Sequence, residues 1–202
     1  MSTEGYRIVL VSGFGNETED VIAAHKGAAA AWQALGIDTQ IIHPDYSSSD
    51  LSPVLAEIHA TKQEGIDRGW KVTKVGSSGG GSFVLAEEII YAVDGQLPGK
   101  NVTICSRMDL IGAADLCTKS PVLAKAVTLV GENKDTFPFT AANTLCFTAG
   151  EVDGVVPAQS SILPHALTQP ITGRGVMNHF RAVGAGLLTL AYQRQVAVFA
   201  KS

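Results

Sequence analysis

Apolar positions along the chain fall into short continuous runs that alternate with longer stretches of helical spacing. The first run, Tyr6–Val11, carries four successive apolar residues and stops at Ser12 and Gly13. Such a run is typical of a strand buried on both faces of a parallel sheet. Between Thr18 and Leu35 the apolar residues recur at three- and four-residue steps, which predicts a helix with Gly36 as its C-terminal cap.

The same two patterns repeat along the rest of the sequence. Further strands are expected over residues 39–43, 70–75, 101–105, 144–148 and, most weakly, 166–169. Further helices are expected over residues 51–67, 82–93, 120–130 and 180–199. The last helix is expected to turn five apolar residues inward: Phe180, Val183, Leu187, Leu188 and Leu190. The alternation predicts an α/β fold, a three-layer α/β/α sandwich with a mostly parallel sheet of about six strands, in one domain over residues 1–202.

Composition narrows the possible partners of the protein. The 202 residues are 46% hydrophobic and 17% charged, which indicates a folded chain with a substantial core. The net charge of −4 gives no broad attraction to nucleic acid or to an anionic membrane. No uncharged apolar run reaches the roughly 18–20 residues of a membrane span. A small-molecule substrate is therefore the expected partner.

Three cysteines bear on location and metal binding. Cys105, Cys117 and Cys146 have no metal-ligand spacing, and an odd number cannot pair completely. This pattern favours reduced, mostly buried thiols in a cytoplasmic protein. The N-terminal sequence also lacks the pattern of a secretory signal peptide. We expect neither a metal nor a cofactor.

A glycine-rich segment between a predicted strand and a predicted helix carries the first candidate chemistry. Residues Gly76–Gly80 fit G-x-S-x-G, with Ser78 in the central position. A serine acts as a nucleophile only when it is exposed and hydrogen-bonded to a base, and a sharp strand-to-helix turn provides that exposure. The flanking glycines relieve the crowding of such a turn. Ser78 is the candidate nucleophile, with Ser77 as the alternative if the turn is shifted by one residue.

Other interpretations of this segment carry less weight. A phosphate loop would have G-x-x-x-x-G-K-[ST] and a dinucleotide fingerprint G-x-G-x-x-G, and Gly76–Gly81 fits neither pattern. A strand–helix turn without chemistry also remains open. Nucleotide or phosphate binding at this turn is the third-ranked functional hypothesis.

A nucleophilic serine needs a histidine as its base. His179 follows the predicted sixth strand, in a loop that leads into the last helix and can reach back over the sheet. His43 ends the second strand and is the next candidate. His25 and His59 lie within predicted helices, far from the expected catalytic edge, and His165 precedes the weak sixth strand.

An acid is needed to orient the histidine. Asp153 lies in a turn-rich loop after the fifth strand, where open α/β sheets gather functional groups. Glu151 is a close alternative and Asp109, beyond the fourth strand, a more distant one. A single aspartate in such a loop can equally be a turn former that bonds its own backbone. The assignment of Asp153 as the acid depends on chain order: Ser78, Asp153 and His179 follow one another in that order, and each lies beyond a different predicted strand.

This order and the motifs around it resemble the α/β-hydrolase superfamily over almost the whole chain. The matching segments are Ile8–Gly15, Gly76–Gly80, Gly150–Pro157 with Ser160 and Ser161, and Asn178–His179. The resemblance implies a nucleophile elbow at Ser78 after the third strand. It also implies an oxyanion hole formed by the backbone N–H groups of Gly79 and Phe14.

Two positions depart from the family pattern. Ser12 stands where members often have histidine, and Asn178 stands where they often have glycine. The chain is also short for the family and leaves only residues 108–143 for a lid. We therefore expect a small cap at most and an accessible site, similar to the minimal lipases and esterases.

These features predict a serine hydrolase that cleaves a carboxylic ester through an acyl-enzyme on Ser78. The same triad would serve a thioesterase or an amidase, and the departures at Ser12 and Asn178 suggest a non-catalytic binding protein as the alternative of another class. Five apolar residues are candidates for an acyl pocket, with core or surface packing as the competing role: Met108, Leu110, Ile111, Phe137 and Phe139.

Overall fold

The computed structural model describes residues 4–15, 18–93, 96–111, 113, 115–149, 153–172 and 178–202. Within these residues, six strands form one sheet in the order β2-β1-β3-β4-β5-β6, and every neighbouring pair is parallel. The strands are β1 (Tyr6–Val11), β2 (Asp38–Ile42), β3 (Lys71–Ser77), β4 (Lys100–Ile104), β5 (Thr144–Thr148) and β6 (Leu167–Pro170). The predicted fold class is confirmed.

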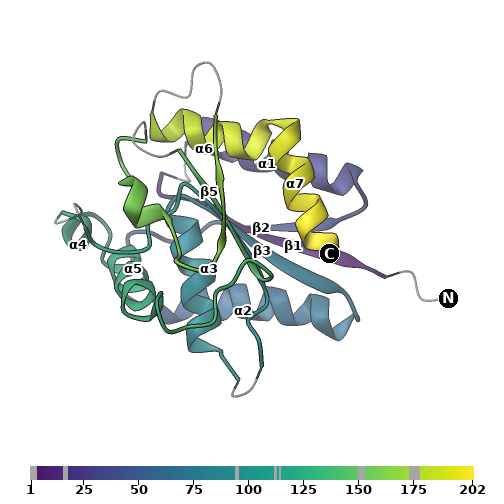
Figure 1. The fold of residues 1–202 in the computed structure, drawn as a ribbon, viewed down its shortest axis with the longest axis horizontal. Helices are drawn as coiled ribbons and strands as arrows, with labels where there is room; N and C mark the ends of the chain where they lie inside the picture. The colour runs from purple at the N-terminus through teal and green to yellow at the C-terminus, as the bar shows by residue number, and fades with distance from the viewer. Residues whose placement is uncertain are drawn as a thin grey trace.

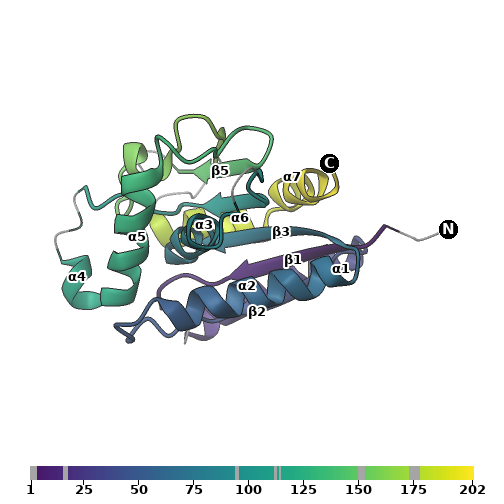
Figure 2. The same ribbon diagram turned by 90° about the horizontal axis from the view of Figure 1, so that it is seen from below.

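Helices cover both faces of the sheet, which gives three layers (Figures 1 and 2). One face packs against α1 (Glu19–Ala34), α6 (His179–Leu188) and α7 (Leu190–Lys201); the other packs against α2 (Ser52–Asp67), α3 (Gly79–Ile90) and α5 (Pro121–Asn133). The short helices α4 (Leu116–Lys119) and η2 (Ala158–Ser161) complete the described elements. No helix in the described part of the chain has the length and apolar character to cross a bilayer.

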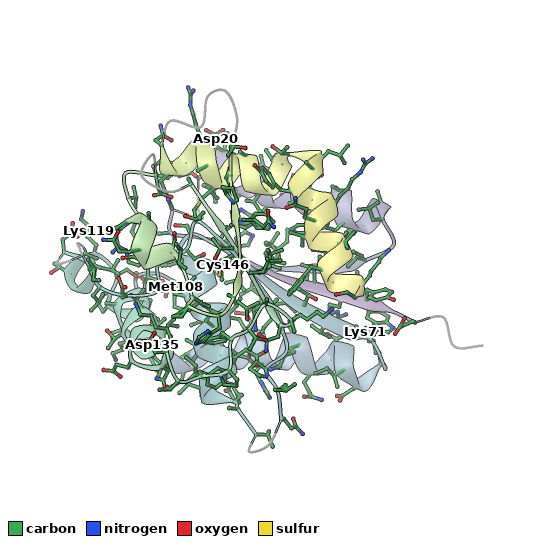
Figure 3. The ribbon with its side chains drawn as sticks, in the orientation of Figure 1. Asp20, Lys71, Met108, Lys119, Asp135 and Cys146 are labelled. Atoms are coloured by element: carbon green, nitrogen blue, oxygen red, sulfur yellow. The ribbon has the colours of Figure 1, made fainter. Side chains whose placement is uncertain are left out.

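The longest element in the region expected to provide any lid, residues 108–143, is α5. This helix packs against α3 and belongs to a sheet-covering layer rather than to a cap. Met108, at the start of the region, lies in the interior and belongs to the same core cluster as Cys146 of β5, whereas Lys119 and Asp135 lie at the periphery (Figure 3).

The central strand β1 shows why its sequence is continuously apolar. Val9 and Val11 pack into the cluster beneath α2, α3 and α5, while Ile8 and Leu10 pack beneath α1, α6 and α7. All four side chains are fully buried. A strand with a helical layer on each face has no solvent side, so it cannot show alternation of apolar and polar residues.

The prediction of a single C-terminal helix over residues 180–199 is wrong. Thr189 adopts an extended conformation with φ −77° and ψ 123°, and it separates α6 from α7. Leu187 is buried as predicted. Three residues predicted to face inward are largely exposed: Phe180, Leu188 and Leu190. The break changes the helical phase, so residues spaced for one continuous face lie on different sides of two helices.

A charged cluster is buried between β3, α2 and α3. Lys74 is 1% exposed, forms ion pairs with Glu87 and Glu88, and donates to the carbonyl of Val84 at 3.1 Å. Lys62 of α2 also pairs with Glu87, at 2.7 Å. Burial lowers the pKa of Lys74, and the two carboxylates oppose that shift. The ion pairs of this cluster thus join β3 to α2 and α3, and each buried charge is compensated by an opposite charge in the cluster.

Replacing Lys74 by methionine is expected to lower the free energy of unfolding by about 3–5 kcal/mol, because it leaves buried carboxylates without their main cation. Lys71→Met is the matched control on the same strand. Lys71 is exposed and pairs with Glu4 at the surface, so its loss should change stability little. Urea unfolding of both variants tests this, and equal effects would contradict the assignment of a buried ion cluster.

Candidate active site

The connection between β3 and α3 is a single residue, Ser78. Its φ of +50° and ψ of −125° lie in a region that residues with side chains rarely adopt, at a cost of about 1–3 kcal/mol. The amide of Ser78 donates to the carbonyl of Ile104 at 2.8 Å, which fastens the turn to β4. The helix starts at Gly79, three residues earlier than predicted, so the turn is sharper than the sequence suggested.

Close backbone approaches explain the glycines around this turn. A Cβ atom at Gly80 would lie 2.2 Å from the carbonyl oxygen of Val11, and one at Gly76 would lie 2.4 Å from the backbone of Gly80. Both distances are below any contact that a side chain tolerates. The G-x-S-x-G pattern is therefore required by the packing of α3 against β1 and β3.

Three residues singled out from the sequence lie within hydrogen-bonding distance of one another. The Oγ of Ser78 is 2.7 Å from Nε2 of His179, and Nδ1 of His179 is 2.8 Å from Oδ1 and 3.0 Å from Oδ2 of Asp153. Ser78 is partly exposed, whereas the other two side chains are buried. Because all strands are parallel, the ends of β3, β5 and β6 bring these residues to one edge of the sheet.

The hydrogen bonds fix which nitrogen of His179 carries the proton. Burial acts to raise the pKa of Asp153, but bonds from His179 and from the amides of Val156 and Val155 lower it below its ordinary value. The ionised carboxylate can only accept, so Nδ1 of His179 holds a proton, and in the neutral imidazole Nε2 is the nitrogen that accepts. The Ser78 hydroxyl therefore donates to Nε2.

The residue before His179 has a structural role. Asn178 is the N-cap of α6, and its side-chain oxygen accepts from the amide of Arg181 at 3.1 Å. Asparagine is among the best N-cap residues. The departure from glycine at this position is therefore compatible with the placement of His179 at the first turn of a helix.

The two residues expected to donate to an oxyanion belong to two different segments near Ser78. Gly79 is the first residue of α3, and the first amides of a helix have no acceptor within it. Phe14 lies in the turn after β1, a neighbour of β3 in the sheet. A Cβ at Gly13 would lie 2.7 Å from the Cβ and 3.4 Å from the Oγ of Ser78. The loop after β1 thus runs directly against the candidate nucleophile.

Ser77, the alternative nucleophile, is fully buried and faces another histidine. Its Oγ lies 2.8 Å from Nε2 of His25, and Nδ1 of His25 lies 2.7 Å from the carbonyl oxygen of Val21. Burial lowers the pKa of His25, which keeps the ring neutral with its proton on Nδ1. The expectation that His25 lies far from the catalytic edge is wrong, because α1 packs its buried face against the end of β3.

The remaining candidates take part in other contacts. Asp109 pairs with Lys134 at 2.8 Å and accepts from the Ser160 hydroxyl at 2.6 Å, so it joins the loop after β4 to α5 and η2. His59 bonds Glu87 of the buried charge cluster at 2.8 Å. Glu151 lies outside the described residues.

The five candidates for an acyl pocket do not gather in one place. Met108 and Phe139 are fully buried in the core beneath α3 and α5, while Leu110 and Ile111 are exposed. Phe137 packs at the margin of that core. The core-packing interpretation is correct for the first two residues.

Exposed apolar side chains instead accompany the candidate catalytic residues. Phe14 is 49% exposed, and Phe180, which is next to His179 in the chain, is 71% exposed with its ring 5.9 Å from the imidazole. Val155 follows Asp153 by two residues and is also exposed. These exposed side chains adjoin the triad residues or the loop that approaches Ser78, and we call them the apolar rim.

The described cysteines are buried free thiols, as predicted. Burial raises the pKa of both Cys105 and Cys146, which makes them poor nucleophiles at neutral pH. The side chain of Cys117 lies outside the described part. No group of three or more His, Cys, Asp or Glu among the described residues is arranged to hold a metal ion.

No protein-family model matches the chain, and no curated protein sequence matches it significantly. Solved structures do match. An α/β-hydrolase superfamily protein from Enterococcus faecalis is 14% identical, with a TM-score of 0.57 over 100% of this chain and 93% of that one. The mature lipase BlEst2 from Bacillus licheniformis is 17% identical, with a TM-score of 0.63 over 97% and 92%. BorB, a type II thioesterase from the borrelidin biosynthetic cluster, is 11% identical, with a TM-score of 0.61 over 100% and 93%. The chain has the α/β-hydrolase fold.

Proposed function

We propose that this protein is a serine hydrolase that cleaves carboxylic esters through an acyl-enzyme formed on Ser78. The observation that carries the proposal is the hydrogen-bonded chain from Ser78 through His179 to Asp153, which begins at a strained turn between β3 and α3. Strain at a partly exposed serine, next to a histidine in the correct tautomer, is the arrangement that nucleophilic catalysis requires.

The reaction follows from the roles of these groups. Ser78 Oγ attacks the ester carbonyl carbon while its proton passes to Nε2 of His179, and the oxyanion accepts hydrogen bonds from the N–H groups of Gly79 and Phe14. His179 then protonates the leaving alcohol, and the acyl group stays on Ser78. Water, deprotonated by His179, attacks the acyl carbon, and the imidazolium then returns its proton to Ser78 Oγ as the acid is released. Asp153 remains ionised and stabilises the imidazolium in both steps. The mechanism needs no cofactor or metal.

The apolar rim supports a substrate with a hydrophobic acyl group. Phe14 follows the glycine that approaches Ser78, Phe180 contacts His179, and burying their exposed apolar surfaces against an acyl chain would be favourable. A thioester is the second candidate, supported by the similarity of the fold to that of a type II thioesterase. A cytoplasmic location is part of the proposal and is supported by the free thiols Cys105 and Cys146.

Steady-state hydrolysis of p-nitrophenyl acetate, butyrate and octanoate, compared with thioesters of the same acids, tests the proposal. We expect measurable ester turnover, with a higher kcat/KM for butyrate or octanoate than for acetate. A kcat/KM at least about tenfold higher for the thioesters would reassign the protein as a thioesterase. A folded protein that hydrolyses neither class would contradict catalysis and favour a binding protein that shares the fold.

A further inference from the structure

Ser12, the first residue after β1, is held through its amide, hydroxyl and carbonyl groups by the last residue of β2 and by the segment that follows it. Its amide donates to the carbonyl of Ile42 at 3.0 Å, and its Oγ lies 3.0 Å from Nδ1 of His43. Its carbonyl accepts from the hydroxyl of Tyr46 at 2.7 Å. The start of the loop that carries Phe14 is therefore fixed by residues about 30 positions further along the chain.

The Tyr46 side chain also contacts both sides of the proposed oxyanion hole. Its ring meets the ring of Phe14 edge-on, with centroids 5.3 Å apart and planes at 82°. A Cβ at Gly79 would lie 3.0 Å from the Tyr46 hydroxyl oxygen, so this residue passes directly over Gly79. Tyr46 thus touches the anchor residue Ser12 and both residues whose amides are proposed to bind the oxyanion.

The direction of the hydrogen bond from Tyr46 is settled by its surroundings. Tyr46 is buried, and burial raises its pKa well above the ordinary value, so the hydroxyl keeps its proton. A backbone carbonyl can only accept, so Tyr46 donates to Ser12. Ser12 itself is fully buried, and no water can replace this donor without a rearrangement of the loop.

We propose that Tyr46 and His43 are positioning residues that hold the loop after β1 so that the N–H of Phe14 is directed at the oxyanion. Gly13 has no side chain to anchor the loop, and its close approach to Ser78 leaves little tolerance for displacement. The orientation of the Phe14 amide then depends on how firmly Ser12 is held. This inference rests on the proposed function, because it assigns a role within the same catalytic site.

The expected signature is a loss of transition-state stabilisation without a loss of substrate binding. Removing an oxyanion donor outright lowers kcat by about 100- to 1,000-fold, so loosening one should have a smaller effect. Tyr46→Phe, which removes only the hydroxyl, is expected to lower kcat for a p-nitrophenyl ester by about 10- to 100-fold. KM should stay within about threefold, because the ground-state carbonyl makes little use of the oxyanion hole.

Affinity for a boronic acid, which forms a tetrahedral adduct on an active serine, provides a readout that a purely structural role would not move. Inhibition by phenylboronic acid should weaken in parallel with kcat in Tyr46→Phe. Tyr6→Phe is the matched control, because its hydroxyl donates to Glu4 at the start of β1, at the opposite end of that strand from Ser12, and it should leave all three quantities unchanged. His43→Ala should lower kcat in the same way, and His43→Asn should recover part of the loss by restoring a bond to Ser12.

The His43 variants keep the inference testable if Tyr46→Phe fails to fold, since the His43 side chain is exposed. The positioning role is overturned if the wild type is active and the kcat of Tyr46→Phe, or of both His43 variants, stays within about twofold of the wild-type kcat. A fall in kcat with no change in boronate affinity would also overturn it. An inactive, folded wild type would instead refute the proposed function itself, and the two failures are thereby distinguished.

Discussion

Replacing Ser78 by alanine is expected to lower kcat for ester hydrolysis by about 10⁴-fold or more, because the variant has no oxygen to form the acyl-enzyme. The fold should be retained. Alanine at φ +50° is strained to a similar extent as serine. The hydrogen bond from the backbone N–H of residue 78 to the Ile104 carbonyl does not involve the side chain, so it is kept in the variant. Steady-state kinetics together with circular dichroism and thermal unfolding check both parts.

The adjacent serine provides a matched control for this variant. Ser77→Ala removes a buried hydroxyl that bonds His25, so it should lower stability by about 1–3 kcal/mol. Its effect on kcat should stay below about tenfold, because Ser77 is fully buried. Loss of turnover in Ser77→Ala with turnover retained in Ser78→Ala would place the nucleophile one residue earlier.

Asp153→Asn is expected to lower kcat by about 10⁴-fold through the tautomer of His179. The amides of Val155 and Val156 both donate to Oδ1, at 3.1 and 2.7 Å, so the asparagine would keep its carbonyl oxygen there. Its NH₂ group would then take the place of Oδ2 and donate to Nδ1 of His179. The histidine proton would move to Nε2, which could no longer accept from Ser78.

Asp109→Asn distinguishes this effect from a general loss of a buried carboxylate. Asp109 also accepts a backbone amide, from Ile111 at 3.1 Å, and its pKa is also lowered despite burial, through Lys134, Ser160 and that amide. Within the described residues, its hydrogen bonds and ion pair do not involve His179, so its replacement should change kcat by less than about tenfold. Stability should fall, because the ion pair with Lys134 is lost. Comparable losses of kcat in both variants, measured on folded protein, would contradict the role assigned to Asp153.

Much of the sheet could be predicted because parallel strands covered on both faces leave a clear signal. The bounds predicted for β1 and β5 agree with the structure, since most positions in these strands are buried and apolar. Helix periodicity was less reliable, because it reports local spacing and not the tertiary contacts that end or redirect a helix. Ser120 shows the same limit: it has the sequence of an N-cap, but its hydroxyl donates to the carbonyl of Tyr46 at 2.9 Å instead.

The three residues of the candidate triad could be found because chain order and strand ends constrain them together. Parallel strands end at one edge, so residues after β3, β5 and β6 meet there even though 101 positions separate Ser78 from His179. No such signal in the sequence marks His25 or Tyr46, which contact residues next to the triad and the proposed oxyanion hole. His25 bonds Ser77, 52 positions away in the chain, and Tyr46 bonds Ser12, 34 positions away. The sequence around His25 and around Tyr46 does not distinguish them from ordinary core residues.

Labelling with a fluorophosphonate probe, followed by peptide mapping of the adduct in wild type and Ser78→Ala, tests the central claim most directly. The probe reacts only with a serine that a neighbouring base has activated. We expect one stoichiometric adduct on Ser78 of the wild type and none in the variant. A folded wild type that forms no adduct, or one whose adduct maps to Ser77, would contradict the claim.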